Sequence, residues 1–386
     1  MTVAVLIGTT KGAFVMRDDG KRGDWTITGP HCDGWPINHV VGDPHSGQIW
    51  AAGGNGWNGA GVWRSQDGGQ TWTLSKLSNG DMDRWIKSDP EAARIFGVTE
   101  VEDAPFTGDL EALWSISSAH GRLYAGGKPG MLFSSDDDGK SWQGVEGINA
   151  HAERENWQGG GAGLTLHTIL RDDKDPAKLW IGISAAGIFA SEDGGTTWET
   201  RNRRSNEDAA AFHIHAHEDG LTHGSDTEIG SCVHNMIHAG DNLIYQQNHH
   251  GTYRSTDGGR SWSAITEGLP STFGFPIAVH PHDPATIWVV PMNGDMQGRY
   301  PPDACAKVWK STNSGETWTA MTDGLPAQNC FFTVLRQAMA VDQMDTPGVY
   351  FGTNSGSIFA SLDGGQSWSE PARHLPTVLS VETLTY

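Results

Sequence analysis

The sequence predicts an all-β chain that folds as a single seven-bladed β-propeller spanning residues 1–386. Three observations support this fold class. An eight-residue pattern returns along the whole chain, no helical period of apolar residues competes with short strands, and the two chain ends supply complementary parts of one sheet. The 51 glycines and 17 tryptophans suit many short strands joined by tight turns. A repeat spread from end to end favours one closed domain over two or three.

The repeated pattern is Ser-x-Asp-x-Gly-x-Ser/Thr-Trp, first met in full at residues 65–72, and we call it the box. Further copies occupy residues 135–142, 191–198, 255–262, 311–318 and 361–368. Only one copy departs at the aspartate position, where it has Asn313. Each box lies between two short apolar runs and is therefore predicted to be the turn of a β-hairpin. Because a carboxylate can accept hydrogen bonds from turn N–H groups, we interpret the aspartates as turn formers, not as catalytic acids.

Each box fits into a four-stranded unit whose strands we name A to D from the axis outward. Strand C ends at the box serine and strand D begins at the box tryptophan, which can fill the space between neighbouring sheets. The inner strands, A, are predicted at residues 37–41, 112–117, 166–170, 232–237, 275–279 and 333–338. These units account for six blades.

The seventh blade is predicted from the two chain ends. Residues 3–8, 12–16 and 25–27 match strands B, C and D, with a degraded box, but no strand A precedes them. Residues 377–381 have an inner-strand pattern with nothing to follow it. The C-terminal strand should therefore complete the N-terminal blade, which closes the ring and removes its free edges.

The long insertions are expected on one face of the ring. Propeller geometry puts D-to-A and B-to-C connections on one face, and the boxes, which are C-to-D turns, on the other. The main insertions are nearly all of the first kind and cover residues 78–110, 144–163, 202–230 and 291–307. We call their face the elaborated face and the opposite one the plain face, and we expect binding and chemistry on the elaborated face.

Charge and cysteine usage limit the partners and the compartment. A formal net charge of −20 disfavours nucleic acid and anionic membranes, and the sequence has no basic run with interleaved aromatic residues. There is no apolar run of 18 residues, and the N-terminus lacks the features of a signal peptide. The four cysteines are far apart without CxxC spacing, as expected of reduced thiols. We therefore expect a cytoplasmic protein.

Histidines on or beside the inner strands are the candidate catalytic residues. His39, His167 and His234 fall within predicted A strands, which line the central channel, and His249 lies in a B-to-C turn. Side chains that converge on one axis can form a site, and imidazoles suit general acid and base roles. The alternative is a set of structural histidines bonded to the backbone at strand ends.

Further candidates for ligand binding lie in loops and at strand ends of the same face. Tryptophan can stack on a sugar ring, and arginine can pair with a carboxylate or phosphate. The candidates are Trp35, Trp157, Gln247, Asn248, Arg299, Asp303 and Arg336. The alternative for each loop tryptophan is packing within its own loop.

A separate run of histidines is a candidate metal site. His213, His215, His217 and His223 lie in one insertion, and the first three alternate as they would on a strand. The spacing differs from the zincin pattern, and a solvated polar loop is the alternative. We expect no cofactor and leave a divalent metal open.

The six boxes resemble the BNR or Asp-box repeat of sialidase-like β-propellers, and the likeness covers nearly the whole chain. Stretches such as "VLIGTTKGAFVM", "GLTLHTIL" and "YQQNHHGTYRSTDGG" resemble a bacterial intracellular subgroup of BNR-repeat, glycosyl-hydrolase-like proteins whose activity is unassigned. Sialidases themselves are similar but six-bladed, and they use three arginines, a Tyr/Glu pair and an aspartic acid. Their Phe-Arg-Ile-Pro motif is absent from residues 12–17. We therefore transfer no sialidase catalytic residue and do not expect exo-sialidase activity.

These observations give two functional hypotheses from different classes. The first is an enzyme or binding protein that holds a sugar-derived or other small polar ligand in the axial pocket; hydrolysis or β-elimination would be its chemistry. The second is a non-catalytic scaffold for protein interaction or assembly. Residues 78–110 discriminate between them, because a lid over the channel would favour the first and a projecting apolar platform the second.

Overall fold

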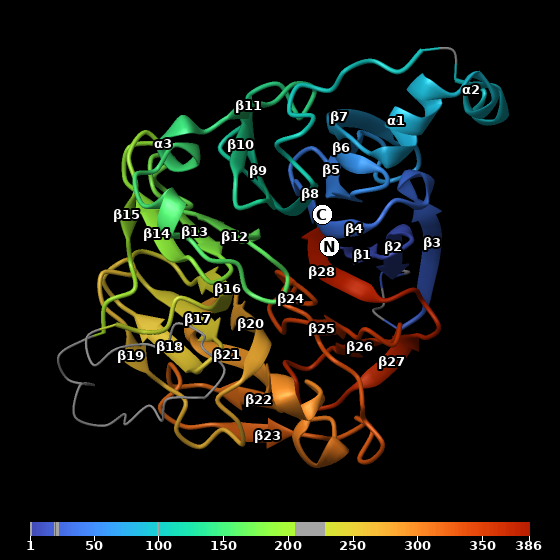
Figure 1. The fold of residues 1–386 in the computed structure, drawn as a ribbon. Helices are drawn as coiled ribbons and strands as arrows, with labels where there is room; N and C mark the ends of the chain where they lie inside the picture. Colours follow the sequence, from blue (N-terminus) through green and yellow to red (C-terminus); the bar gives the residue numbers. More distant parts are fainter. Residues whose placement is uncertain (1, 19, 21–22, 99, 205–227) are drawn as a thin grey trace.

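The computed structural model describes residues 2–18, 20, 23–98, 100–204 and 228–386, and these residues form seven four-stranded sheets around a central axis (Figure 1). Within each sheet neighbouring strands are antiparallel and follow the order A-B-C-D outward from the axis. The seven-bladed β-propeller predicted from the sequence is thereby confirmed.

The first blade consists of β28 (Val378–Thr385), β1 (Val3–Thr9), β2 (Gly12–Asp18) and β3 (Trp25–His31). The next three blades are β4 (Ile37–Gly42), β5 (Ile49–Asn55), β6 (Gly59–Ser65), β7 (Thr73–Asn79); β8 (Ala112–Ala119), β9 (Arg122–Lys128), β10 (Leu132–Ser135), β11 (Gln143–Gly144); and β12 (Leu166–Arg171), β13 (Leu179–Ile183), β14 (Gly187–Ser191), β15 (Glu199–Thr200). The last three are β16 (Val233–His238), β17 (Ile244–Asn248), β18 (Gly251–Ser255), β19 (Ser263–Ala264); β20 (Gly274–His280), β21 (Asp283–Pro291), β22 (Val308–Ser311), β23 (Thr319–Met321); and β24 (Met339–Val341), β25 (Val349–Gly352), β26 (Ile358–Ser361), β27 (Ser369–Ala372).

The box is a turn held together by its own side chains. In the first copy, Ser65 Oγ donates to Asp67 Oδ1 at 2.7 Å and accepts from Gly69 N at 2.7 Å. Asp67 also accepts from the backbone N–H of Thr71 at 2.9 Å and from its hydroxyl at 2.6 Å. Gly69 has a φ of +90°, a conformation that side-chain-bearing residues rarely adopt. These bonds support the interpretation of the aspartates as turn formers.

Tryptophans on two of the B strands connect their blade to the next. Trp50 on β5 donates its Nε1–H to the carbonyl of Asp138, in the box of the following blade, at 3.0 Å. Trp180 on β13 makes the same contact with Gly258 at 2.8 Å. Both indoles are almost fully buried, so each ring packs between two sheets while its hydrogen bond fixes the ring's orientation. The hydrophobic core is accordingly divided into clusters at the blade interfaces.

The ring closes as the sequence predicts. β28 pairs with β1 in antiparallel register from Val3 opposite Thr385 to Thr9 opposite Val378, with a bulge at the end of this ladder. Thr2 N donates to the carbonyl of Tyr386 at 2.8 Å, which extends the pairing to the chain ends. The two termini lie next to each other near the centre of the ring (Figure 1).

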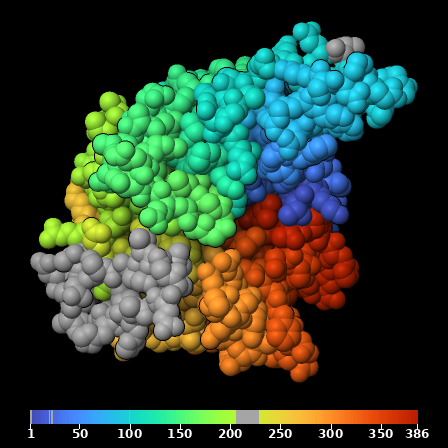
Figure 2. Space-filling view, in the orientation of Figure 1, coloured from blue at the N-terminus to red at the C-terminus, as the bar shows by residue number. Residues whose placement is uncertain are grey.

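The insertion at residues 78–110 projects outward from the ring. It carries α1 (Asp81–Ser88) and α2 (Pro90–Phe96), and Figure 2 shows the pair as a protrusion beyond the outline of the blades. A smaller insertion, residues 144–163, contains α3 (Glu146–Asn149). No helix of the described residues is long and apolar enough to cross a membrane.

One predicted inner strand is wrong. Residues 333–338 are not a strand; the inner strand of that blade is β24, which begins only at Met339. Ala338 N donates to Leu335 O at 3.1 Å, which makes a turn just before the strand. The side-chain amide of Gln337 donates to the carbonyl of His167, three blades away, while the Gln337 carbonyl accepts from Val381 N at 2.8 Å. The segment therefore crosses the channel, with the side chain of Gln337 bonded to the inner strand of the fourth blade.

Candidate functional site

Several predicted site residues come together at the end of the channel where the inner strands begin. His234 is the second residue of β16, and His249 follows β17 in the adjoining B-to-C turn. Arg336 lies on the segment that crosses the channel, and Arg299 follows the short 3-10 helix η4 (Asp295–Gln297) in the insertion at 291–307. We call the group formed by His234, His249, Arg299, Arg336 and one cysteine, Cys232, the mouth cluster.

The thiol of Cys232 lies between two imidazoles. Its Sγ is 3.7 Å from Nε2 of His234 and 3.9 Å from Nδ1 of His249. Nδ1 of His234 contacts the carbonyl oxygen of Gly274 at 2.6 Å. A carbonyl can only accept, so Nδ1 carries the hydrogen and Nε2 presents a lone pair toward the thiol.

Aromatic side chains form one wall of the mouth cluster. The ring of Phe275 lies 4.7 Å from that of His234, and the ring of Phe273 lies 5.0 Å from those of both His234 and His249, centroid to centroid. His234 is buried, whereas Cys232 and His249 are partly exposed. The cluster thus has an apolar side and an accessible side.

Two guanidinium groups lie over the same phenylalanine. The carbon Cζ of Arg336 is 5.1 Å from the ring centroid of Phe275, and that of Arg299 is 5.7 Å away. Arg299 forms an ion pair with Asp295. Arg336 has no carboxylate within 4.0 Å among the described residues, and its buried Nε has no hydrogen-bond partner there. The mouth cluster therefore contains one uncompensated positive charge.

Burial shifts the titration of these groups. It lowers the pKa of Arg336 to about 10, so the guanidinium stays charged at neutral pH. Burial lowers the pKa of His234 and of His167 well below the usual histidine value, and the positive charge of Arg336 lowers both further. Burial likewise raises the pKa of the Cys232 thiol, although Arg336 opposes this shift. Both histidines are therefore neutral at pH 7.

The other two candidate histidines lie elsewhere in the channel. His39 on β4 contacts Glu382 Oε1 through Nε2 at 3.1 Å and accepts from the backbone N–H of Ile116 through Nδ1 at 3.0 Å. It thus links the inner strands of three blades. His167 is fully buried, and its Nδ1 is 2.9 Å from the hydroxyl of Thr168. His167 adjoins the mouth cluster through Arg336, and His39 does not.

Most of the remaining described candidates contact neighbouring residues of the protein. Trp35 packs edge-on against Trp63 with ring centroids 5.8 Å apart, and Trp157 lies against Phe189 at 5.0 Å. The side-chain amide of Gln247 donates to the carbonyls of Asn248, Gly251 and Thr272. The side-chain amide of Asn248 donates to the carbonyl of Gly230, and the side chain of Asp303 is largely exposed. His213, His215, His217 and His223 lie outside the described residues.

Cys232 is the member of the mouth cluster that sequence reasoning missed. It stands two residues before His234, so the Cys-x-His spacing at the start of an inner strand was a usable signal. The wide separation of the four cysteines, taken alone, predicts only reduced thiols. His249 lies opposite Cys232 at the end of the β16–β17 hairpin, so the pairing of this inner strand with its neighbour was a second usable signal.

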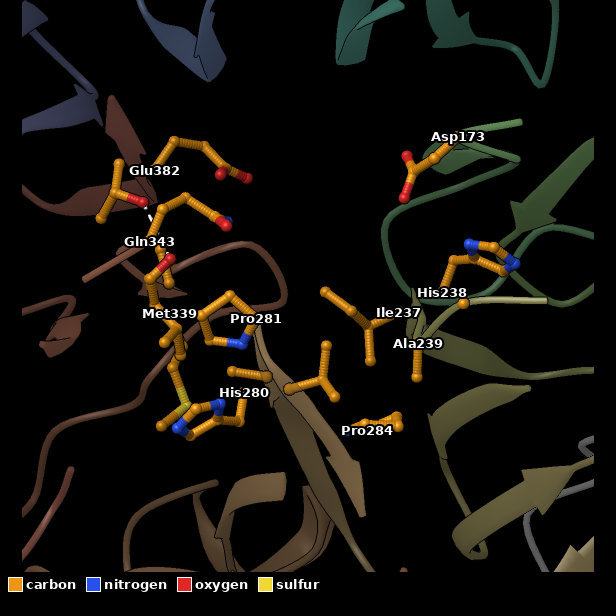
Figure 3. Close-up of a pocket in the computed structure, with 16 residues that line it drawn as sticks. Asp173, Ile237, His238, Ala239, His280, Pro281, Pro284, Met339, Gln343 and Glu382 are labelled. Carbon is orange, nitrogen blue, oxygen red and sulfur yellow. Dashed lines mark hydrogen bonds between the residues drawn. The ribbon is translucent and has the colours of Figure 1, made fainter. Parts of the chain in front are cut away.

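The axial cavities found in the described part of the chain open at the opposite end, on the plain face. One has a volume of about 420 Å³ and is lined by the ends of inner strands, including Ile237, Val279 and Val341, with Glu382 and His280 among its polar groups (Figure 3). A second, of about 670 Å³, lies beside it. These cavities lie at the plain face, whereas the segment before β24 crosses the channel at the elaborated face.

Comparison with known proteins identifies the repeat and the fold. Residues 253–264 match the model of the BNR/Asp-box repeat. No curated protein matches this sequence. Among solved structures, an ancestral GH74 enzyme is similar with a TM-score of 0.52 and 15% sequence identity. The likeness covers 84% of this chain but only 36% of that enzyme.

Two other similar structures have nearly the same size as this chain. YCF48 bound to D1 peptide has a TM-score of 0.51 at 16% identity, covering 87% of this chain and 80% of its own. A candidate 6-phosphogluconolactonase from Bacteroides uniformis has a TM-score of 0.56 at 9% identity, covering 99% of both chains. At these identities the likeness shows a shared propeller fold.

Proposed function

We propose that the mouth cluster binds a small anionic ligand, such as a sugar acid or a sugar phosphate, at the elaborated face of the propeller. The observation that carries this proposal is Arg336, a partly exposed cation without a carboxylate partner among the described residues. A buried guanidinium nitrogen without a partner is costly, and an anionic oxygen would satisfy it. Arg299, on the same phenylalanine ring, adds positive charge although Asp295 partly compensates it.

The same arrangement supports a chemical step on the bound ligand. The Nε2 lone pair of His234 and the imidazole of His249 lie beside the arginines, where they could accept a proton during hydrolysis or β-elimination. The sugar-processing enzymes among the structural neighbours support this reaction class only through their shared fold. The four cysteines are free thiols, which fits the reducing cytoplasm expected for such an enzyme.

Calorimetric titration with 6-phosphogluconate, glucuronate, inorganic phosphate and neutral glucose tests the proposal. At least one of the anions should bind, and glucose should not. The Arg336→Ala variant should bind that anion about 10- to 100-fold more weakly, since a hydrogen bond to a charged group contributes about 1.5–3 kcal/mol. Arg336→Lys should fall between the two, because lysine keeps the charge but lacks the planar fork of donors.

The matched control is Arg373→Ala, which removes an exposed arginine paired with Glu370 and should leave the affinity unchanged. Anion binding that survives Arg336→Ala would refute the mouth cluster as the site. Loss of binding in Glu382→Gln instead would place the ligand in the cavity at the plain face.

A second candidate function is protein docking, which the outward projection of α1 and α2 favours. Trp57, Trp85, Ile95 and Phe96 are between 41% and 62% exposed on this projection. The rings of Trp57 and Trp85 are 6.2 Å apart, and those of Trp85 and Phe96 are 5.7 Å apart. Contiguous exposed aromatic residues of this kind are typical of protein-binding surfaces.

Site-specific photo-crosslinking in cells tests the docking candidate. A benzoylphenylalanine at position 96 should form one discrete adduct, and the same residue at position 373, an exposed site on a distant blade, should form none. Binding of the purified partner should weaken by at least about tenfold in Trp85→Ser, as expected when a central aromatic contact is lost. Unchanged affinity in that variant would exclude the platform as the docking surface.

A further inference from the structure

We infer that Cys232, His234 and His249 form a site for a transition-metal ion, with zinc as the best match. The sulfur and one nitrogen of each imidazole all lie within 4.8 Å of one another. In a tetrahedral zinc site, with Zn–S about 2.3 Å and Zn–N about 2.05 Å, a sulfur and a nitrogen ligand are separated by about 3.6 Å. The separations of 3.7 Å and 3.9 Å from Cys232 Sγ are close to this value.

The chemistry of the three groups also fits. Thiolate together with imidazole selects zinc or copper over magnesium and calcium, which prefer oxygen ligands. The site lies in a chain whose four cysteines are all free, so the sulfur is not consumed by a disulfide. Three protein ligands, moreover, leave one coordination position open, as in catalytic zinc sites.

The surroundings orient the ligands as metal sites require. The contact between His234 Nδ1 and the Gly274 carbonyl at 2.6 Å fixes the tautomer that leaves Nε2 free to coordinate. Phe273 and Phe275 pack against the imidazoles and hold one side of the site apolar. This outer layer resembles the backbone acceptors and apolar walls that support metal-bound histidines.

The nearby arginine suggests what occupies the open position. A divalent ion and one thiolate leave a net positive charge, and Arg336 adds another within the mouth cluster. An anionic oxygen could bind the metal and Arg336 together, which would offset both charges. This part of the inference rests on the proposed function; the three-ligand metal site does not. With a metal bound, His234 and His249 would act as ligands instead of proton acceptors.

Cobalt substitution tests the site, because Co²⁺ bound to thiolate gives a sulfur-to-cobalt charge-transfer absorption. The full chain, freed of metal with a chelator, should take up one thiolate-ligated Co²⁺, and zinc should displace it. Cys232→Ser should abolish the charge-transfer absorption, and His249→Gln should weaken cobalt binding while the circular dichroism spectrum stays native. Arg336→Ala should retain the absorption, which separates this test from that of anion binding.

Two control variants decide between this site and other metal-binding groups of the chain. Cys305→Ser removes a different free cysteine, and the fourfold alanine variant of His213, His215, His217 and His223 removes the other histidine group; both should keep the charge-transfer absorption. The inference is overturned if wild-type protein shows no such absorption, or if Cys232→Ser keeps it. If Cys232→Ser fails to fold, the folded His249→Gln variant decides. Loss of the charge-transfer absorption in that variant supports the site, and full retention of the absorption refutes it.

Discussion

Among single residues, the aspartates of the boxes show how a local pattern produces both a turn and a pH response. Asp137 accepts hydrogen bonds from the backbone and the hydroxyl of Ser141, which lower its pKa to about 2. In the variant copy, Asn313 Oδ1 accepts from Thr317 N at 3.0 Å, while its amide nitrogen donates to the Thr317 hydroxyl at 3.0 Å. The turn thus forms without a carboxylate, because the Thr317 hydroxyl accepts a hydrogen bond from the Asn313 amide, whereas the Ser141 hydroxyl donates one to Asp137.

This difference predicts a residue-specific acid response. Because the folded-state pKa of Asp137 is depressed, its contribution to stability is complete above about pH 4 and is lost as the pH falls toward about 2. Asp137→Asn should lower the melting temperature at pH 7 by no more than about 2 °C, since the carboxylate is only partly buried, and should reduce the further loss between pH 4 and pH 2. Asn313→Asp should gain such a loss. Melting curves of both variants that run parallel to wild type across this range would contradict the account.

At the scale of elements, the hairpins were predictable and the segment before β24 was not. Each box determines its own turn through contacts within eight residues, so sequence alone locates strands C and D. The pattern at residues 333–338 is compatible with an inner strand, but Gln337 has its partner on His167, 170 positions away in sequence. A contact of that range has no local signature, and it displaced the predicted strand.

The same reasoning applies to the candidate site. The repeat predicts His234 on an inner strand near the axis, whereas Arg336 approaches it from the irregular segment before β24, which the strand pattern does not predict. Cys232 and His249 flank the paired ends of β16 and β17, where His249 N donates to the Cys232 carbonyl at 3.0 Å. The register of this hairpin includes a shift between Val233 and Asn235, which the spacing in the sequence does not specify. Trp35 and Trp157, the candidates for stacking on a sugar, each pack against an aromatic residue of a strand, Trp63 on β6 and Phe189 on β14, and the sequence of the loops does not show these contacts.

On the scale of the whole molecule, closure of the ring explains why the site can exist. β28 joins the chain ends, with Val378 and Val381 fully buried, so the seven inner strands surround one axis instead of ending at open edges. The ring brings together residues from the fifth, sixth and seventh blades at the elaborated face. Its plain face carries an axial cavity of about 420 Å³, shown in Figure 3, which is the competing location for a ligand.

The most direct test of the central claim, that the mouth cluster is the functional site, is a crystal structure of the protein grown with zinc and phosphate and recorded on both sides of the zinc absorption edge. We predict an anomalous peak about 2.0–2.3 Å from Cys232 Sγ, His234 Nε2 and His249 Nδ1, with phosphate density between that peak and Arg336. Zinc and phosphate found only at other places, such as the cavity beside Glu382, with Arg336 and Cys232 contacting nothing but protein, would contradict the claim.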